Sequence, residues 1–236
     1  MAGETTKTEA ICLRIHPWSQ TSHVVQWLTP AGKVATVVKG AVRPKSAFLG
    51  QYDLNYTCDI VYYLRARNEL HALRECVPVG TRDALRGSLP SLLAADHFRA
   101  LAGELAPTGE EAREWFELLA GSLDALAATA AQGPDPDRAV LAAELVEFEL
   151  SALRLSGLFP EIEAESGVFA LRGERKIPVS EAVTRCLRNP RAEKNLQILL
   201  DAARVIGVFY DFHLDCPLNG RRAVLKSISQ QKEKAT

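Results

Sequence analysis

The first eighty residues alternate apolar and polar positions with the two-residue period of strands that are buried on one side. Val34, Thr36 and Val38 form one such series, and β-branched residues suit a pleated, half-buried surface. Short connections containing Gly, Pro or Asn separate the runs, which is typical of strands joined by tight turns. The pattern predicts strands over residues 9–15, 22–29, 33–39, 52–64 and 70–77.

From Thr81 onward, the apolar positions recur every three or four residues, which is the period of an amphipathic helix. Residues 108–111 read Thr-Gly-Glu-Glu, a capping-box pattern, and Asp137 is placed to cap another helix. Residues 160–178 contain two Gly and a Pro at their end and show no such period. The pattern predicts helices over residues 91–105, 108–130, 137–156, 179–187 and 192–214.

This order of elements predicts an α+β protein with two domains. Residues 1–80 would form a five-stranded antiparallel barrel of the OB-fold type, a common binder of oligonucleotides, and residues 81–236 an all-helical domain. No run of about 18 apolar residues occurs, so no membrane span is expected. The N-terminus lacks the apolar core of a signal peptide, so a cytoplasmic protein is expected.

Charge is distributed unevenly along the chain. The formal net charge is only −1, but residues 1–80 carry nine Lys or Arg against six Asp or Glu, and residues 171–236 carry thirteen against seven. The segment between them carries six against sixteen. Because charges act over roughly 8–10 Å at physiological salt, two basic ends can attract a polyanion although the whole chain is nearly neutral.

The most informative basic segment follows the third predicted strand. Gly40 and Pro44 interrupt that strand, so Lys39, Arg43 and Lys45 are expected on a turn. Cations on a loop above a rigid barrel can contact a phosphate backbone. The alternative is a solvated basic loop that binds nothing.

Other cations and one aromatic side chain extend this predicted surface. Trp18 lies in a turn beside Pro17, where exposure would allow it to stack on a base, whereas Trp27 and Tyr62 are expected in the core. No motif for reading base edges is visible, so little sequence preference is expected. The residues predicted to contact DNA are Arg14, Trp18, Lys33, Lys39, Arg43, Lys45, Arg65, Arg67, Arg221, Arg222 and Lys226.

No catalytic motif is present, which disfavours a hydrolase. The chain lacks a Gly-x-x-x-x-Gly-Lys phosphate loop, a Gly-x-Ser-x-Gly nucleophile and a His-Glu-x-x-His zinc motif. Asp211, His213 and Asp215 are close in sequence, but on a helix His213 points about 160° away from both carboxylates. The five cysteines are scattered and are expected to be reduced and buried.

Several of these segments carry a resemblance to a known family. Residues 8–14 (Thr-Glu-Ala-Ile-Cys-Leu-Arg), the turn at residues 28–33 (Leu-Thr-Pro-Ala-Gly-Lys) and above all residues 38–46 (Val-Lys-Gly-Ala-Val-Arg-Pro-Lys-Ser) resemble the N-terminal domain of the bacterial recombination mediator RecO. Residues 155–160 (Leu-Ser-Gly-Leu-Phe-Pro) are similar to the family's Leu-Gly-Leu-x-Pro element, and residues 218–222 to its basic C-terminal end. The resemblance covers most of the chain.

The resemblance implies a non-catalytic mediator of DNA repair and recombination, cytoplasmic and associated with the nucleoid. Such a protein binds single- and double-stranded DNA, anneals complementary strands and, with RecR, promotes RecA loading onto DNA coated with single-strand-binding protein. Two separate basic regions suit annealing, because each can hold one strand. Arg221, Arg222 and Lys226 are expected to project from the helical domain as the second region. The alternative is an adaptor whose barrel binds a protein, which weak or salt-insensitive DNA binding would favour.

One feature of the family is missing from this sequence. Many members resemble one another in a Cys-x-x-Cys pair after the Leu-x-Pro element, with a second cysteine pair further on. The corresponding residues 161–169 contain no cysteine, and Cys186 stands alone. Because a structural zinc needs about four ligands, we expect no metal and no cofactor. A degenerate, cysteine-free insertion near residues 160–178 would instead be held by Val168, Phe169, Leu171 and Ile177.

Overall fold

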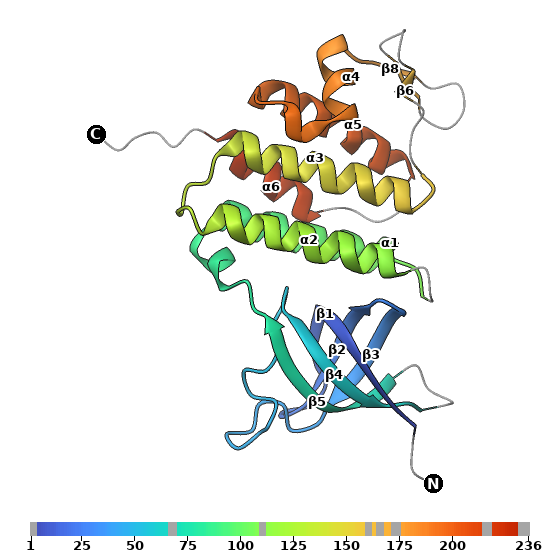
Figure 1. Ribbon diagram of the computed structural model, residues 1–236, viewed down its shortest axis with the longest axis vertical. Coiled ribbons are helices and arrows are strands. Elements are labelled where there is room, and N and C mark those ends of the chain that lie inside the picture. Colours follow the sequence, from blue (N-terminus) through green and yellow to red (C-terminus); the bar gives the residue numbers. More distant parts are fainter. Residues whose placement is uncertain are drawn as a thin grey trace. The chain divides into compact units, whose positions relative to one another are not determined.

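The chain divides into two compact units, and two of its helices contribute to both. The computed structural model (Figure 1) describes residues 4–65, 70–108, 112–158, 162–163, 168–170, 176–213 and 219–230. The first unit comprises Met1–Arg82 and Ala102–Leu123, and the second comprises Asp83–Leu101 and Asp124–Thr236. The shared helices are α1 (Leu89–Leu105) and α2 (Ala112–Ala130).

A closed five-stranded barrel forms most of the first unit (Figure 1). This confirms the barrel of the OB-fold type that the two-residue periodicity predicts. Around the barrel, the strands follow the order β1 (Thr5–Pro17), β2 (His23–Thr29), β3 (Gly32–Val38), β5 (Leu70–Gly80) and β4 (Thr57–Tyr63).

One detail of the predicted barrel was wrong. Four neighbouring pairs are antiparallel, but β3 and β5 run parallel. A closed ring with an odd number of strands cannot alternate direction all the way round. Closure therefore requires a parallel pair, and here it joins β3 and β5, which are not consecutive in the chain.

Alternate side chains of the strands fill the interior of the barrel. Trp27 is fully buried, and its indole Nε1 donates a hydrogen bond to Thr36 Oγ1 at 2.9 Å, which satisfies its single polar atom. Tyr62 is also buried, so both aromatic residues lie in the core as predicted. A hydrogen bond with Cys58 and burial both raise the pKa of the Cys76 thiol. The Cys76 thiol therefore stays protonated and unreactive.

Helices dominate the second unit. The predicted cap at Asp137 is present, because its side chain accepts a hydrogen bond from Ala139 N at 2.8 Å. Among the described residues, no helix is both long and apolar enough to cross a bilayer. Besides its parts of α1 and α2, the unit contains η1 (Asp83–Gly87), α3 (Arg138–Leu155), α4 (Glu181–Arg188), η2 (Pro190–Ala192), α5 (Leu196–His213) and α6 (Asn219–Ser229).

The last helix, α6, is absent from the sequence prediction. Its helical character comes from packing rather than from a long apolar period. Val224 and Ile228, four residues apart, are both fully buried, and most helical stability in proteins comes from such packing. Gly220, in the first turn, lies against α1, since a Cβ there would make an ordinary van der Waals contact of 3.7 Å with the Cα of His97.

A small sheet interrupts the helical unit where the insertion is predicted. Strands β6 (Ile162–Glu163), β7 (Val168–Ala170) and β8 (Lys176–Pro178) pair antiparallel, with β7 in the centre. The helical domain therefore carries a short sheet at the place where the sequence indicates an insertion without helical periodicity. Phe169 and Ile177 are register neighbours in this sheet, while Leu171 lies outside the described residues.

Candidate nucleic-acid interface

The connection from β3 to β4, residues 39–56, is a series of turns attached to the barrel. Gly40 N donates a hydrogen bond to Ser22 Oγ at 3.2 Å, and Val42 N donates one to Thr21 O at 3.3 Å. Both acceptors belong to the turn between β1 and β2. The basic loop and this turn therefore form one connected surface, although about twenty residues separate them in sequence.

The side of this connection that faces the barrel is apolar. Ala41 is buried, and Phe48, Tyr52 and Leu54 pack partly buried against the barrel core. The Tyr52 hydroxyl lies 2.8 Å from Nδ1 of His23, and burial raises the pKa of this phenol. These aromatic rings hold the loop in place.

Lys39, Arg43 and Lys45 lie on the exposed side of the loop. Gly40 has a φ of 66°, a left-handed value that glycine adopts without strain. The Arg43 side chain folds over this glycine, since a Cβ there would lie 3.2 Å from Arg43 Cδ. Within the described part of the chain, no carboxylate pairs with any of the three cations. Their charges thus remain available to a polyanion.

Trp18 stands at the start of the β1–β2 turn with 65% of its surface exposed. Its backbone N donates a hydrogen bond to Ser22 O at 2.8 Å, which closes the turn. The hydroxyl of the same serine accepts the hydrogen bond from Gly40 N. The structure therefore brings this tryptophan together with the loop that carries Lys39.

Arg14 and Lys33 belong to a different part of the first unit. Arg14 pairs with Glu104, and Lys33 Nζ donates to Gly103 O at 3.1 Å, while burial lowers the pKa of Lys33. Lys33 and Lys39 are at opposite ends of β3, about 20 Å apart at the rise of a strand. Because Arg14 already binds Glu104 and Lys33 already binds the Gly103 carbonyl, we leave these two cations out of the proposed interface.

Arg65 is exposed just after β4, as a phosphate contact requires. Its backbone N donates to His71 Nδ1 at 3.2 Å. Burial and, to a smaller extent, the Arg65 charge lower the pKa of His71, which favours the neutral imidazole that can accept this bond. Arg67 lies outside the described residues.

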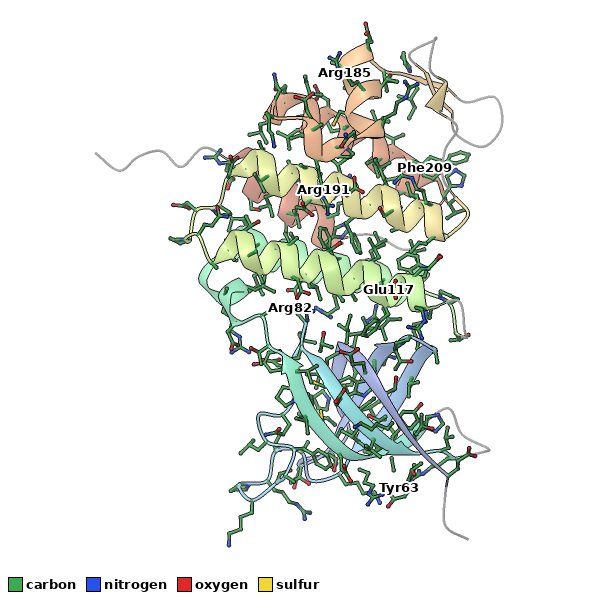
Figure 2. The ribbon with its side chains drawn as sticks, in the orientation of Figure 1. Tyr63, Arg82, Glu117, Arg185, Arg191 and Phe209 are labelled. Carbon is green, nitrogen blue, oxygen red and sulfur yellow. The ribbon has the colours of Figure 1, made fainter. Side chains whose placement is uncertain are left out.

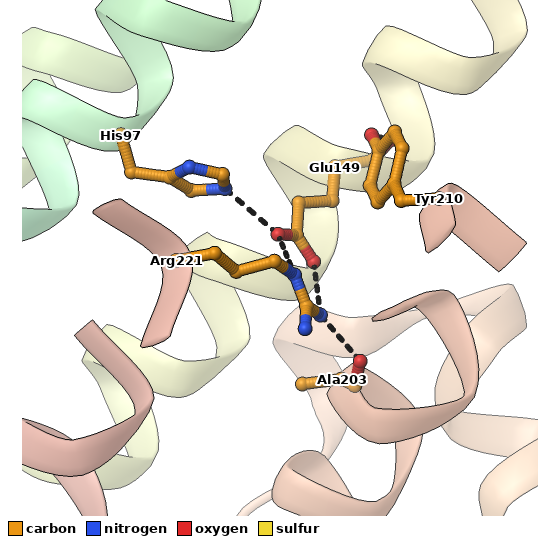
Figure 3. Close-up of polar contacts among 5 residues, drawn as sticks. All are labelled: His97, Glu149, Ala203, Tyr210 and Arg221. Atoms are coloured by element: carbon orange, nitrogen blue, oxygen red, sulfur yellow. Dashed lines mark hydrogen bonds and ion pairs between the residues drawn. The ribbon is translucent and has the colours of Figure 1, made fainter. Parts of the chain in front are cut away.

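The three C-terminal cations on α6 have different environments. Arg222 and Lys226 are exposed, whereas Arg221 is buried. Figure 3 shows the Arg221 guanidinium inside the helical unit, where Nε donates to Glu149 Oε1 at 2.6 Å and Nη2 to Glu149 Oε2 at 2.9 Å. The expectation that Arg221 projects toward DNA was therefore wrong, because its fork of donors is occupied by a buried carboxylate.

Glu149 is the centre of a buried polar network (Figure 3). His97 Nε2 lies 2.8 Å from Glu149 Oε1, and the Tyr210 hydroxyl donates to the Glu149 backbone oxygen at 2.9 Å. Arg221 also donates to Ala203 O. The network thus ties α6 to α1, α3 and α5. The sequence analysis missed Glu149, although a carboxylate flanked directly by Phe148 and Leu150 in a predicted helix was a usable signal.

Gly207 makes room for this network. It lies in the middle of α5, where glycine is unfavourable by about 1 kcal/mol relative to alanine. A Cβ at this position would lie 2.5 Å from Arg221 Nη1 and 3.2 Å from its Cζ. The guanidinium therefore occupies the space that any other side chain at position 207 would need.

The Glu149 network predicts a specific dependence of stability on pH. Burial raises the pKa of this carboxyl, but the Arg221 charge and hydrogen bonds from His97 and Arg221 outweigh it, so the pKa falls below its ordinary value of 4.5. The stabilising contribution of the carboxylate is therefore complete above pH 4.5 and is lost as the pH falls through the lower, folded value.

We expect Glu149→Gln to remove this contribution. The difference in unfolding free energy between the wild type and this variant should be constant between about pH 6 and 8 and shrink below about pH 4.5. Urea unfolding at a series of pH values measures it. A difference that persists unchanged to about pH 3 would contradict the assignment.

Other exposed cations of the second unit escaped the sequence analysis. Arg185, labelled in Figure 2, and Arg188 lie one turn apart on the exposed face of α4. Arg191 is also exposed, but both ends of its guanidinium bind Glu144 at 3.0 Å, so it is neutralised. Arg185 and Arg188 thus contribute exposed positive charge to this unit, in addition to that of Arg222 and Lys226.

The structure gives no metal site in its described residues, where no group of three or more potential ligands lies close enough to hold an ion. Asp211 and His213 are among the described residues, whereas Asp215 lies outside them. Four cysteines, Cys12, Cys58, Cys76 and Cys186, are buried and form no disulfide. No cysteine-based zinc site is therefore formed by these four thiols.

The barrel, its anchored loop and the helical unit define the class of protein, an OB-fold-like barrel followed by helices. Residues 1–82 match the model of the recombination protein O N-terminal domain, and residues 86–222 match that of its C-terminal domain. The chain therefore belongs to the recombination protein O (RecO) family.

Curated relatives agree with this assignment. The chain is 33% identical over 162 residues to the DNA repair protein RecO of Anaeromyxobacter sp. (strain K), which covers 68% of this chain and 60% of that protein. It is 30% identical over 131 residues to the DNA repair protein RecO of Roseiflexus sp. (strain RS-1), covering 56% and 46% respectively. The match spans 60% of the length of the first of these relatives.

Proposed function

We propose that this chain is a non-catalytic DNA repair and recombination protein that binds DNA through Lys39, Arg43 and Lys45. The observation that carries the proposal is the state of these cations: exposed, unpaired within the described residues and held on a loop fixed to an OB-fold-like barrel. Membership in the RecO family supports the role in repair. Residues 1–80 would be the DNA-binding domain.

Within this role, we propose that the protein anneals complementary strands. Bringing two strands together requires screening their mutual repulsion, which cations achieve by replacing condensed counterions. The barrel loop would hold one strand, and the exposed Arg222 and Lys226 would contribute a second basic region on the helical unit. No reacting side chain is needed for such a process.

The partners we propose follow from the family assignment. They are single- and double-stranded DNA, RecR, single-strand-binding protein and, indirectly, RecA, which would be loaded onto DNA freed from single-strand-binding protein. RecR would join the complex as a protein partner. The cell compartment we propose is the cytoplasm, in association with the nucleoid.

A salt titration of DNA binding tests this proposal. Three phosphate contacts predict that the logarithm of the single-strand association constant falls with the logarithm of salt concentration with a slope of about −2. Fluorescence anisotropy of a labelled oligonucleotide between about 50 and 200 mM salt, with and without RecR, measures this slope. Absent or salt-insensitive binding in both series would contradict the proposal and favour a protein adaptor.

A further inference from the structure

We propose that the basic loop takes single-stranded DNA with one base stacked on Trp18, and so prefers single strands to duplex. This inference rests on the proposed function, because it names the form of DNA that the same surface binds. We call residues 18–22 together with residues 39–45 the loop–turn surface. Its distinguishing feature is an exposed indole on a turn that is hydrogen-bonded to a loop of cations unpaired within the described residues.

The exposure of Trp18 sets it apart from the other two tryptophans. It is 65% exposed, whereas Trp27 is 0% and Trp115 is 2% exposed. Tryptophan has the largest apolar surface of any side chain and is usually buried to a large extent. An indole left in water on a barrel with a well-packed interior is free to accept a flat apolar ligand.

Hydrogen bonds hold the backbone of Trp18 close to the loop that carries the cations. Trp18 N is 2.8 Å from Ser22 O, and Ser22 Oγ is 3.2 Å from Gly40 N. These contacts keep the backbone of Trp18 within about 10 Å of the residue that follows Lys39. Even at the compact duplex rise of about 3.4 Å per phosphate along each strand, that distance spans no more than about three nucleotides. One strand can therefore reach the indole and the cations together.

Stacking on Trp18 discriminates between single strands and duplex. In a single strand the faces of the bases are accessible, and each stacks favourably on an aromatic ring without regard to its identity. In duplex the faces are covered by neighbouring base pairs, so stacking would require unstacking a step. Phosphate contacts by Lys39, Arg43 and Lys45 are available in both forms. The indole therefore adds affinity for single strands only.

Intrinsic fluorescence provides a direct readout, because the chain has three tryptophans and only Trp18 is exposed. We expect a thymidine oligonucleotide of about 20 residues to quench the emission on binding, since a stacked base contacts the indole. The same titration with Trp18→Phe protein should show no quenching. That comparison excludes an indirect effect on Trp27 or Trp115.

Affinity measurements on the full chain supply the second arm. Trp18→Ala should weaken binding of the thymidine oligonucleotide by about 5- to 150-fold, while duplex affinity changes less than about twofold. Trp18→Phe, which keeps an aromatic face, should retain most of the affinity. Leu49→Ala is the matched control, because Leu49 is an exposed apolar residue of the same connection, 54% exposed, without an aromatic ring.

The outcomes separate this inference from the function on which it rests. Quenching that Trp18→Phe abolishes, with a loss confined to single strands in Trp18→Ala, supports stacking. Salt-dependent binding without quenching, or equal losses for single strands and duplex, overturns stacking, leaves the proposed function intact and points to a protein ligand for the indole. If neither form of DNA binds the wild-type protein, the proposed function and the stacking inference both fail.

Discussion

Replacing Arg221 with Met is expected to lower the free energy of unfolding by about 3–5 kcal/mol. The substitution keeps much of the side-chain volume but leaves the Glu149 carboxylate, whose side chain is fully buried, without its charged partner. An uncompensated buried charge costs far more than an exposed one. Urea unfolding followed by circular dichroism at neutral pH measures the change.

The neighbouring residue provides the matched control. Arg222→Met removes the same charge from an exposed position, where substitutions usually change stability by less than about 0.5 kcal/mol. The double variant Glu149→Leu with Arg221→Met should recover most of the loss, because both charges are then absent. Equal effects of the two single arginine variants would show that the buried pair does not stabilise α6 as described.

Replacing Lys39, Arg43 and Lys45 together by Ala is expected to weaken single-strand binding by about 100-fold at 0.1 M salt. Each lost phosphate contact removes about 0.7 from the salt slope on single strands and about 0.9 on duplex, so the slopes should fall by about 2 and about 3. Because the three side chains are exposed, the thermal unfolding of the protein should change little. Anisotropy titrations at several salt concentrations measure both quantities.

A second triple variant controls for the loss of charge as such. Lys7, Arg74 and Lys194 are exposed cations outside the loop, and replacing them by Ala removes the same formal charge. This variant should retain a slope within about 0.7 of the wild type, the value of a single contact. If the two triple variants lose affinity and slope equally, the loop is no special part of the binding surface.

The barrel was predictable because its signal is local. The two-residue period of strand positions such as Val34, Thr36 and Val38 depends only on neighbouring residues, and it predicted the five barrel strands. The parallel pairing of β3 with β5 depends on closure of the sheet, which no single strand encodes. Likewise, the two-residue period gives the burial of Trp27 but not its hydrogen bond to Thr36.

The basic loop was predictable for the same reason. Gly40 and Pro44 interrupt the strand, so Lys39, Arg43 and Lys45, which lie next to or between them, are placed on an exposed turn. Arg14 and Lys33 are also cationic residues of the barrel, but Arg14 binds Glu104, 90 residues further along the chain, and Lys33 binds the carbonyl of Gly103, 70 residues further along. Packing of that distant segment on the barrel is the reason for leaving them out of the proposed interface.

Arg221 and Arg222 are adjacent and chemically identical, and the sequence assigned both to the same surface. It correctly determined an OB-fold-like barrel, most of the helices and an exposed basic loop, since backbone preference and periodicity are set by residues close in sequence. Which arginine is exposed was decided by the tertiary structure, because Glu149, 72 residues away, offers a buried carboxylate to one side of α6. The availability of a charge depends on the partner it meets, and partners of buried charges here come from distant parts of the chain.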